Sequence, residues 1–378
     1  MKIIFLGTHG QFNIGDELLL ETFLTQIGPQ HHYAVNSYDP EYTAAMLRSK
    51  FDVESFHTTK ELVRFLKLLL TSDILFFGGG SIIKELYASV GRNRYSTLLM
   101  ILFSVTFTKL VARKKVIMSN IGVGPLLSPG GERLARWILN QVDFVSLRDD
   151  KSLRTCQKLG IKPEKMLRVP DAVFANAPYV FLPESATLAP AGRLNIALNL
   201  NYDIENRDAW EGFLQNLAAC LIQLNAETPL TLHALPMQSK FKANDDLTVL
   251  KEFSGRIPGI PFIFHELQTA QQAGDLISRC DLVLAERLHT LVISSILGKP
   301  FFGLVYDVKV QELVDYLGMS AHSLNINQPF ETRTLLSGLK RVLDESDMIH
   351  RQLTTRSSVL RKELDTYFAE IRTKIQPR

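Results

Sequence analysis

The sequence has few cysteines, no strong excess of one charge and no long apolar run, and each shortage excludes a class of protein. Its three cysteines, Cys156, Cys220 and Cys280, are far apart and show no CxxC spacing. We therefore expect free thiols in a reducing compartment rather than a disulfide framework or a zinc site. The 42 basic and 39 acidic residues give a formal charge of +3. Net charge therefore gives no reason to expect nucleic-acid binding.

The most apolar segment is too short to cross a bilayer. Residues 98–105 are nearly all apolar, and Lys109, Arg113, Lys114 and Lys115 follow them, whereas a membrane span needs about 20 apolar residues. We interpret 98–115 as a buried helix, and a contact with the membrane surface is the alternative. The apolar run after Met1 is short and leads into a glycine loop, so it predicts a strand rather than a signal peptide. We expect a cytoplasmic protein, with peripheral contact at the inner face of the membrane left open.

Two familiar ligand signatures are also missing. The opening glycine loop does not match GxGxxG and no Walker lysine follows it, so there is no nucleotide-binding fingerprint. The Asp and His residues do not form a clustered ligand set, so we expect no metal and no cofactor.

What the sequence does have is a regular alternation of short apolar runs with helical patterns. This alternation predicts βαβ units and parallel sheets covered on both faces. In the first half the predicted strands are Lys2–Leu6, His32–Ser37, Ile74–Phe77, Lys115–Ile121, Phe144–Leu147 and Met166–Val169. In the second half they are Leu194–Leu200, Leu230–Leu235, Pro261–Phe264, Asp281–Ala285 and Pro300–Val305.

A proline-rich stretch without periodicity separates the two series. We therefore predict an α/β protein with two doubly wound, Rossmann-like domains that face each other across a cleft. The N-terminal domain covers 1–177, a linker 178–193, the C-terminal domain 194–329 and a helical tail 330–378.

Three glycine-bearing turns follow strands of the first domain. The opening loop contains Asn13, Gly15, Asp16 and Glu17, and its glycines allow close approach of a ligand to a helix N-terminus. Asn13 and Asp16 are candidates to bind a polar ligand or to cap that helix. The second turn is Gly78-Gly79-Gly80-Ser81 and the third is Gly122-Val123-Gly124-Pro125. Tight turns required by packing are the alternative for each, but three in one domain favour a shared site.

Two polar residues complete this edge of the first domain. Arg148 follows a strand, before Asp149 or Asp150 caps a helix, and we expect its guanidinium at the cleft mouth, where it can bind a carboxylate or phosphate. Asp171 follows the next predicted strand and is a candidate for the same site.

The strongest chemical signal lies in the second domain. Arg287-Leu288-His289 follows the strand Asp281–Ala285, and Lys309 follows the next strand. A lone histidine more often packs than reacts, but here an arginine and a lysine, both suited to anions, lie at neighbouring strand ends. We therefore interpret His289 as functional.

These segments, taken in order, resemble the polysaccharide pyruvyl transferase family. The resemblance rests on the opening loop with Asn13 to Glu17, on Gly78-Gly79-Gly80, on residues 121–125 and 146–149, on Asp171 and on Arg287-Leu288-His289. It continues through Gly298-Lys299-Pro300 and residues 306–310, and it covers roughly 1–320. No single segment is specific, but the ordered set is.

The resemblance implies a fold similar to B-type glycosyltransferases and transfer of a pyruvyl group from phosphoenolpyruvate to a sugar or lipid-linked saccharide. The reaction would close a cyclic ketal and release phosphate, with phosphoenolpyruvate as co-substrate. His289 would be the general acid, and Arg148, Arg287, Leu288 and Lys309 would bind the donor. The first domain would be the acceptor side, with Asn13, Asp16, Gly79, Gly80 and Asp171 as its candidates.

The sequence departs from the family pattern at two positions. Glu286 stands where the family approaches the Arg-Leu-His segment through serines, and Ala172 follows Asp171 where the family often has proline. Glu286 also keeps open a nucleotide-sugar glycosyltransferase of the same architecture, in which it would contact a ribose. A further alternative is a non-catalytic partner in polysaccharide assembly that uses 98–115 or the helical tail at the membrane surface.

Overall fold

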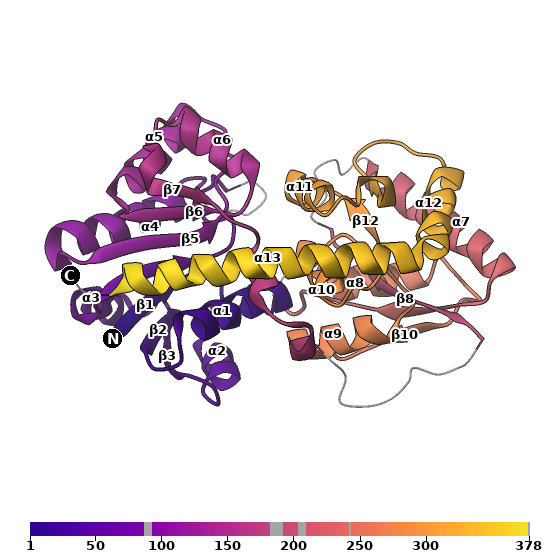
Figure 1. The fold of residues 1–378 in the computed structure, drawn as a ribbon, viewed down its shortest axis with the longest axis horizontal. Coiled ribbons are helices and arrows are strands. Elements are labelled where there is room, and N and C mark those ends of the chain that lie inside the picture. Colours follow the sequence, from indigo (N-terminus) through magenta and orange to yellow (C-terminus); the bar gives the residue numbers. More distant parts are fainter. Residues whose placement is uncertain (87–92, 182–191, 203–208, 242, 377–378) are drawn as a thin grey trace. The chain divides into compact units, whose positions relative to one another are not determined.

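The computed structural model describes residues 1–86, 93–181, 192–202, 209–241 and 243–376. The chain divides into two compact units (Figure 1). Unit 1 comprises Met1–Gln11, Asp16–Ala175 and Lys362–Arg378, and unit 2 comprises Phe12–Gly15 and Asn176–Arg361.

Unit 1 is built on a parallel sheet of seven strands among its described residues, in the order β3-β2-β1-β4-β5-β6-β7. The chain runs from β1 to one edge, crosses back and continues to the other edge, which is the doubly wound arrangement. The strands are β1 (Lys2–Leu6), β2 (His32–Asn36), β3 (Asp52–Phe56), β4 (Ile74–Gly78), β5 (Lys115–Ile121), β6 (Phe144–Leu147) and β7 (Met166–Arg168). The helices are α1 (Ile14–Ile27), α2 (Pro40–Leu47), α3 (Leu62–Thr71), α4 (Ser96–Phe107), α5 (Pro129–Gln141) and α6 (Asp150–Lys158).

The central strand β4 explains why this sheet is covered on both faces. Its sequence, Ile-Leu-Phe-Phe-Gly, is buried throughout, as expected for a parallel strand between two helical layers. Leu75 and Phe77 belong to the core cluster that contains the inner sides of α3, α4, α5 and α6. Phe76 points to the other face, because side chains alternate along a strand, and there it packs with Phe5 and Phe23.

Unit 2 repeats the architecture with a parallel sheet of six strands among its described residues, in the order β10-β9-β8-β11-β12-β13. Its strands are β8 (Leu194–Asn199), β9 (Leu230–Ala234), β10 (Phe262–Phe264), β11 (Leu282–Ala285), β12 (Phe301–Val305) and β13 (Ser323–Asn325). Its helices are α7 (Trp210–Glu227), α8 (Asp246–Ser254), α9 (Ala270–Arg279), α10 (Leu288–Ile296), α11 (Val308–Tyr316) and α12 (Thr332–Asp344). The predicted class, two Rossmann-like α/β domains with a helical C-terminal tail, is confirmed.

Aspartates begin several of these helices. Asp149 caps α6 as predicted, and Asp245 and Asp307 cap α8 and α11, each by accepting a hydrogen bond from a backbone N–H of the first turn. Helix α10 is different because its N-cap residue is Arg287, which has no acceptor atom in its side chain. The positive end of the α10 dipole therefore carries a basic residue instead of a carboxylate.

The unit boundaries differ from the predicted domains in three places. The main segment of unit 1 ends at Ala175 rather than at residue 177, since Asn176 begins a segment of unit 2. Residues Phe12–Gly15 of the opening loop cluster with unit 2. The tail is helical, but its long helix α13 (Ser346–Ile375) contributes to both units, since unit 1 takes up the chain again at Lys362. Of the predicted linker, 182–191 lies outside the described residues; its start forms a 3-10 turn, η5 (Pro178–Phe181), that packs on α9.

The apolar segment 98–115 is buried along one side only. Its helical part is α4 followed by a π-helical turn, η2 (Thr108–Ala112), and Lys115 already begins β5, so the helix ends earlier than predicted. Leu98, Ile101 and Val105 are buried, whereas Leu99 and Phe103 are about half exposed. Among the described residues, no helix combines the length and the apolar character needed to cross a bilayer.

Candidate functional site

Arg287 is held by a buried carboxylate in unit 2. Its Nη2 and Nε atoms donate to the two carboxylate oxygens of Asp246 at 2.6 and 3.2 Å. The Asp246 side chain is 1% exposed and that of Arg287 is 14% exposed. A bidentate pair shielded from water fixes the plane of the guanidinium, so the orientation of Arg287 is set before any ligand binds.

A small polar network ties this pair to the ends of two strands. Asp246 Oδ2 also accepts hydrogen bonds from the backbone N–H groups of Met237 and Gln238 at 3.1 and 3.2 Å. Asn199, at the end of β8, donates to Leu235 O and accepts from the backbone N–H of Arg287, both at 2.9 Å. Neither Asp246 nor Asn199 belongs to a motif that the sequence reveals.

His289 lies in the first turn of α10 and is buried. The opening loop reaches it: a Cβ atom at Gly15 would lie 2.7 Å from His289 Cγ and 2.9 Å from its Cβ. Ile14 N donates to Met237 O at 2.8 Å, and Asn13 forms an antiparallel bridge with Gln238. The loop segment Phe12–Gly15 is therefore part of the surroundings of His289.

This placement divides the predicted acceptor residues. Asn13 belongs to unit 2, whereas Asp16 belongs to unit 1, where it lies in the first turn of α1. The Asn13 side chain accepts a hydrogen bond from Gly15 N at 3.0 Å, which stabilises the turn. The other candidates, Gly79, Gly80 and Asp171, lie in unit 1.

Glu286, the departure from the family pattern, is fully buried beside Arg287. Its Oε2 atom accepts a hydrogen bond from Asn201 Nδ2 at 2.7 Å. The carboxyl group thus joins the end of β11 to the chain that follows β8, the same two strands that Asn199 links.

Lys309 lies at the start of α11 in unit 2. Its Nζ atom is 3.1 Å from Asp307 Oδ2, and the Lys309 side chain is 41% exposed. The other oxygen of Asp307 caps α11, so the same carboxylate begins the helix and pairs with the partly exposed Lys309.

Unit 1 gathers a second group of predicted residues at the carboxyl ends of its strands. Arg148 Nη2 donates to Ser81 Oγ at 3.1 Å, and its guanidinium lies 3.7 Å from the carboxylates of both Asp149 and Asp171. Arg148 is 9% exposed and Asp171 is 7% exposed. Arg148 is therefore enclosed by the residues predicted with it, rather than projecting from the surface.

The position of Asp171 depends on Asn120, which the sequence analysis did not single out. Asn120 Nδ2 donates to Pro170 O at 2.6 Å, and its Oδ1 accepts from Ala172 N at 2.9 Å. These bonds hold the backbone on both sides of Asp171. Asn120 adopts a left-handed conformation with φ 55°, a strained state that asparagine tolerates better than most residues.

The backbone conformation of the turn after β4 explains why the turn contains glycines. Gly79 and Gly80 have φ values of 66° and 74°, which side chains disfavour. A Cβ at Gly79 would also collide with the Leu19 side chain of α1, 2.7 Å from its Cγ. The turn thus brings Ser81 to Arg148 and packs α1 closely against the sheet.

A buried carboxyl group lies under the opening loop in unit 1. Glu17 Oε1 accepts a hydrogen bond from Gly10 N at 2.6 Å, and burial raises the pKa of Glu17 to about 8. His9, beside it in the loop, has its pKa lowered to about 4 by burial. Both groups are therefore largely neutral at pH 7, which removes two charges from the base of the loop.

Comparison with known proteins places the chain in a family. The model of the polysaccharide pyruvyl transferase family matches residues 13–308. The chain belongs to this family. The resemblance found from the ordered motifs is therefore confirmed, and the matched range includes the opening loop segment, Arg148, Asp171 and Arg287-Leu288-His289.

Among its relatives is the amylovoran biosynthesis protein AmsJ of Erwinia amylovora, 21% identical over 334 residues, or 83% of this chain and 76% of AmsJ. Solved structures with a similar fold include Anabaena HepE in complex with UDP, with TM-score 0.65, 13% identity and coverage of 99% of this chain and 100% of HepE. A glycosyltransferase of Rickettsia africae gives TM-score 0.64 at 12% identity, over 99% of this chain and 98% of the other. These structural likenesses confirm the predicted similarity to glycosyltransferase folds.

Proposed function

We propose that the chain transfers a pyruvyl group from phosphoenolpyruvate to a sugar of a cell-surface polysaccharide or its precursor, forming a cyclic ketal and releasing phosphate. One observation carries the proposal. In this member of the family, Arg287-Leu288-His289 lies at the junction of β11 and α10, at the carboxyl end of a parallel strand, where sheets of this kind bind their ligands. No cofactor takes part other than phosphoenolpyruvate as co-substrate.

The proposed reaction begins with protonation of the methylene carbon of phosphoenolpyruvate. This step leaves an oxocarbenium ion at the neighbouring carbon, which one sugar hydroxyl attacks while losing its proton. A second hydroxyl of the same sugar then displaces phosphate from that carbon, and its proton leaves with the phosphate or with solvent. The methylene becomes a methyl group, two C–O bonds to the sugar form, and one C–O bond to phosphate breaks.

In this proposal His289 supplies the first proton, a task suited to an imidazole because its reference pKa of about 6.5 lies close to neutrality. Arg148, Arg287 and Lys309 bind the carboxylate and phosphate of the donor, with Leu288 beside them. Arg287 is suited to this role because Asp246 already fixes its guanidinium, so little side-chain entropy is lost on binding. Asn13, Asp16, Gly79, Gly80 and Asp171 remain the candidates for the acceptor.

The test is phosphate release from phosphoenolpyruvate with free, nucleotide-linked and lipid-linked sugars as acceptors. His289→Gln should lower kcat by about 10²- to 10⁴-fold, the usual contribution of a general acid. His57→Gln, a histidine in a loop of unit 1, is the matched control and should retain the rate. Absence of phosphate release with every acceptor, or a full rate for His289→Gln, would contradict the proposal.

A second candidate function is a nucleotide-sugar-dependent glycosyltransferase, favoured by the fold likeness to HepE, whose structure holds UDP. In that function the buried Glu286 would act on the nucleotide indirectly, by positioning Asn201, which donates a hydrogen bond to its carboxylate. Calorimetric titration separates the two functions. Binding of UDP without binding of phosphoenolpyruvate supports the glycosyltransferase, and the reverse supports the pyruvyl transferase.

A further inference from the structure

The exposed apolar side chains of the protein are concentrated on one part of unit 1. Eighteen large apolar side chains are exposed in the part of the chain that the structure describes, and seven of them lie on α3, α4 and η2. Single exposed apolar residues are ordinary, but a concentration of them marks a binding surface. We name this the α3–α4 surface; its apolar residues are Leu62, Val63, Leu70, Leu99, Phe103, Leu110 and Val111.

The elements of this surface are neighbours in the fold. η2 continues α4 directly and contacts α3, and α4 packs on α5. The inner sides of the three helices share one core cluster, through residues such as Phe65, Leu98 and Ile138. Their outer sides therefore form a continuous layer over the same face of the sheet. Trp137 of α5, 53% exposed, belongs to this layer.

Three apolar side chains of this surface are mostly exposed to solvent. Val63 is 83% exposed, Leu110 is 71% exposed and Val111 is 58% exposed. On helix α3 the inner residues Phe65, Leu68 and Leu69 already provide the contact with the core. Packing of unit 1 therefore does not account for the outer apolar residues.

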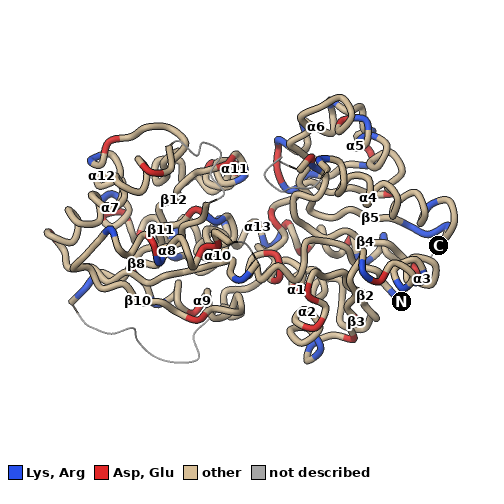
Figure 2. Tube along the Cα trace, turned by 180° about the vertical axis from the view of Figure 1, so that it is seen from behind, with Lys and Arg blue, Asp and Glu red and all other residues tan. Residues whose placement is uncertain are grey.

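The charge on this surface is predominantly positive. The sequence contains no aspartate or glutamate at 62–72 or at 86–131, while Arg64, Lys67, Arg94, Lys109 and Arg113–Lys115 lie in those ranges. Lys109 pairs with Asp143 at 2.8 Å and Arg64 pairs with Glu61, also at 2.8 Å. Lys67, Arg113 and Lys114 have no carboxylate partner among the described residues. Figure 2 shows basic residues in blue close to the C-terminus, where β5 begins at Lys115.

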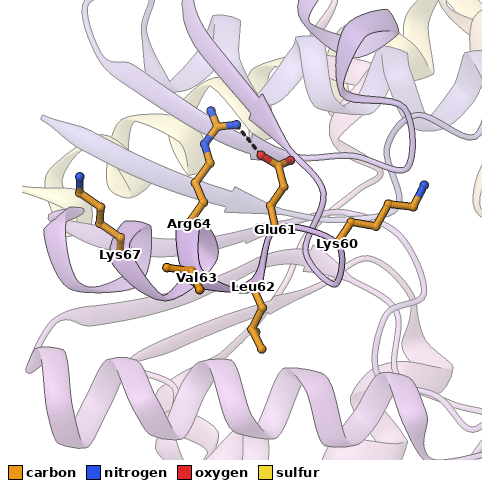
Figure 3. A pocket seen from close by; sticks show the side chains of 6 residues that line it. All are labelled: Lys60, Glu61, Leu62, Val63, Arg64 and Lys67. Atoms are coloured by element: carbon orange, nitrogen blue, oxygen red, sulfur yellow. Dashed lines mark hydrogen bonds and ion pairs between the residues drawn. The ribbon is translucent and has the colours of Figure 1, made fainter.

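An open hollow of about 640 Å³ marks the start of α3 on this surface. Its lining is Lys60, Glu61, Leu62, Val63, Arg64 and Lys67, and it includes none of the predicted site residues. Figure 3 shows Arg64 turned toward Glu61, while Lys60 and Lys67 extend away from each other on either side. The hollow thus combines two outlying ammonium groups with the exposed side chains of Leu62 and Val63.

We infer that the α3–α4 surface binds an anionic lipid bilayer, with its apolar side chains in the headgroup boundary and its basic residues on the phosphates. Apolar residues with flanking Lys and Arg and a tryptophan at the edge are the features of proteins that lie on a membrane without crossing it. The acidic residues Glu61 and Asp143 are paired with Arg64 and Lys109, so the surface keeps an excess of positive charge. The excess of positive charge favours this occupant over a neutral apolar partner. The inference rests on this surface alone and not on the proposed reaction.

The first experiment measures binding of the full chain to vesicles of phosphatidylcholine with about 30% phosphatidylglycerol, against pure phosphatidylcholine, by co-sedimentation. We expect binding to the anionic vesicles that weakens as salt screens the charges. Leu110→Ser/Val111→Ser should weaken it roughly ten-fold through lost apolar burial. Lys67→Gln/Arg113→Gln should weaken it by about 25-fold, since each basic residue contributes roughly five-fold.

Matched controls carry the same changes elsewhere on the chain. Ile222→Ser/Val359→Ser alters exposed apolar residues of α7 and α13, and Lys158→Gln/Lys251→Gln alters exposed lysines. Both should bind vesicles like the wild type. All variants should also keep the rate of phosphate release with a free sugar, so a failure of membrane binding is distinct from a failure of the proposed function.

The second experiment locates the contact. The sequence has two tryptophans, Trp137 and Trp210, so Trp210→Phe leaves Trp137 as the reporter. Lipids brominated in the acyl chain should quench its emission in anionic vesicles. Absence of binding at low salt, unchanged binding of Leu110→Ser/Val111→Ser, or absence of quenching would overturn the inference. A dimer that Leu110→Ser/Val111→Ser dissociates in sedimentation velocity would assign the surface to a second copy instead.

Discussion

At the scale of single residues, the chemistry of unit 2 depends on how Arg287 is held. A buried arginine that loses its carboxylate leaves an uncompensated charge, which costs about 3–5 kcal/mol. Asp246→Asn should therefore lower the free energy of unfolding by about 3 kcal/mol and raise the KM for phosphoenolpyruvate. Urea unfolding and steady-state kinetics measure the two effects.

The control for Asp246→Asn is Glu211→Gln, which removes another bidentate partner of an arginine in the same unit. Glu211 binds Arg256 at 2.7 and 3.0 Å, but the Glu211 side chain is 57% exposed and that of Arg256 is 35% exposed. Its loss should leave stability and KM nearly unchanged. Equal stability losses for the two variants would show that burial of the Asp246–Arg287 pair has no particular importance.

Glu17 gives a pH dependence that can be assigned to one residue. Burial raises the pKa of Glu17 to about 8, from 4.5 in the unfolded chain. Its contribution to stability is complete below pH 4.5 and declines as the pH rises to about 8, with a slope of at most about 1.4 kcal/mol per pH unit. The glutamine of Glu17→Gln stays neutral, so the stability of this variant relative to wild type should increase from about pH 5 to about pH 8 and then level off.

Urea unfolding at each pH unit from about 5 to about 9 measures this difference. The glutamine side chain keeps an oxygen that accepts the Gly10 N–H hydrogen bond, so the substitution changes charge rather than shape. Glu41→Gln on the exposed side of α2 is the control, and its curve should run parallel to that of the wild type. A constant offset between Glu17→Gln and wild type at all pH values would contradict the assignment.

At the scale of elements, periodicity was a good guide where a strand is buried on both faces. The predicted strands Lys2–Leu6, Lys115–Ile121 and Phe144–Leu147 agree with β1, β5 and β6 to the residue. Two of the four edge strands were missed, whereas β7 and β10 were predicted as Met166–Val169 and Pro261–Phe264. The missed strand β3 reads Asp-Val-Glu-Ser-Phe and the missed strand β13 reads Ser-Leu-Asn, and both are partly exposed. A short polar strand at a sheet edge has no apolar run to reveal it.

The polar residues that position the site were missed for a related reason. Asn120, Asn199 and Asp246 each form a hydrogen bond with a residue that lies 36 to 52 positions away in the sequence. No local pattern reports such a partner. The glycine turns, Arg148 and the Arg-Leu-His segment were found because they lie at strand ends, where position alone suggests ligand binding.

The opening loop is the element whose placement the sequence did not indicate. Gly15→Ala should displace His289, because the added Cβ would lie 2.7 Å from His289 Cγ, closer than real Cβ atoms approach. We expect a loss of kcat of at least about ten-fold with a folded protein by circular dichroism. Gly212→Ala, a helical glycine of α7 with open space around it, is the control and should retain activity with equal or higher stability.

At the scale of the whole molecule, the single helix α13 contributes residues to both units. Its first part packs in unit 2, where Ser357 Oγ donates to Ser295 O at 2.8 Å. Its last part packs in unit 1, where Tyr367 shares a hydrogen bond with Ser146 at 2.6 Å. A tail predicted from helical spacing alone is thus a structural component of both units, since spacing shows that a helix has an apolar side but not what covers it.

Deletion of residues 362–378 should therefore destabilise unit 1 selectively. The deleted segment buries Leu364, Tyr367, Phe368, Ile371 and Ile375, and loss of one core phenylalanine alone costs about 3–5 kcal/mol. Hydrogen exchange should become faster in β4, β5 and β6, while β8, β11 and β12 of unit 2 keep their protection.

Two full-length variants make this prediction independent of whether the shortened chain stays folded. Leu364→Ala/Phe368→Ala removes buried side chains of α13 and should reproduce the faster exchange in unit 1. Glu363→Ala/Thr366→Ala changes exposed positions of the same turns and should leave exchange unchanged. Helix α13 is continuous from Ser346 to Ile375. Selective loss of protection in unit 1 would mean that the two units unfold separately. Equal loss of protection in both sheets would contradict the prediction and mean that they unfold together.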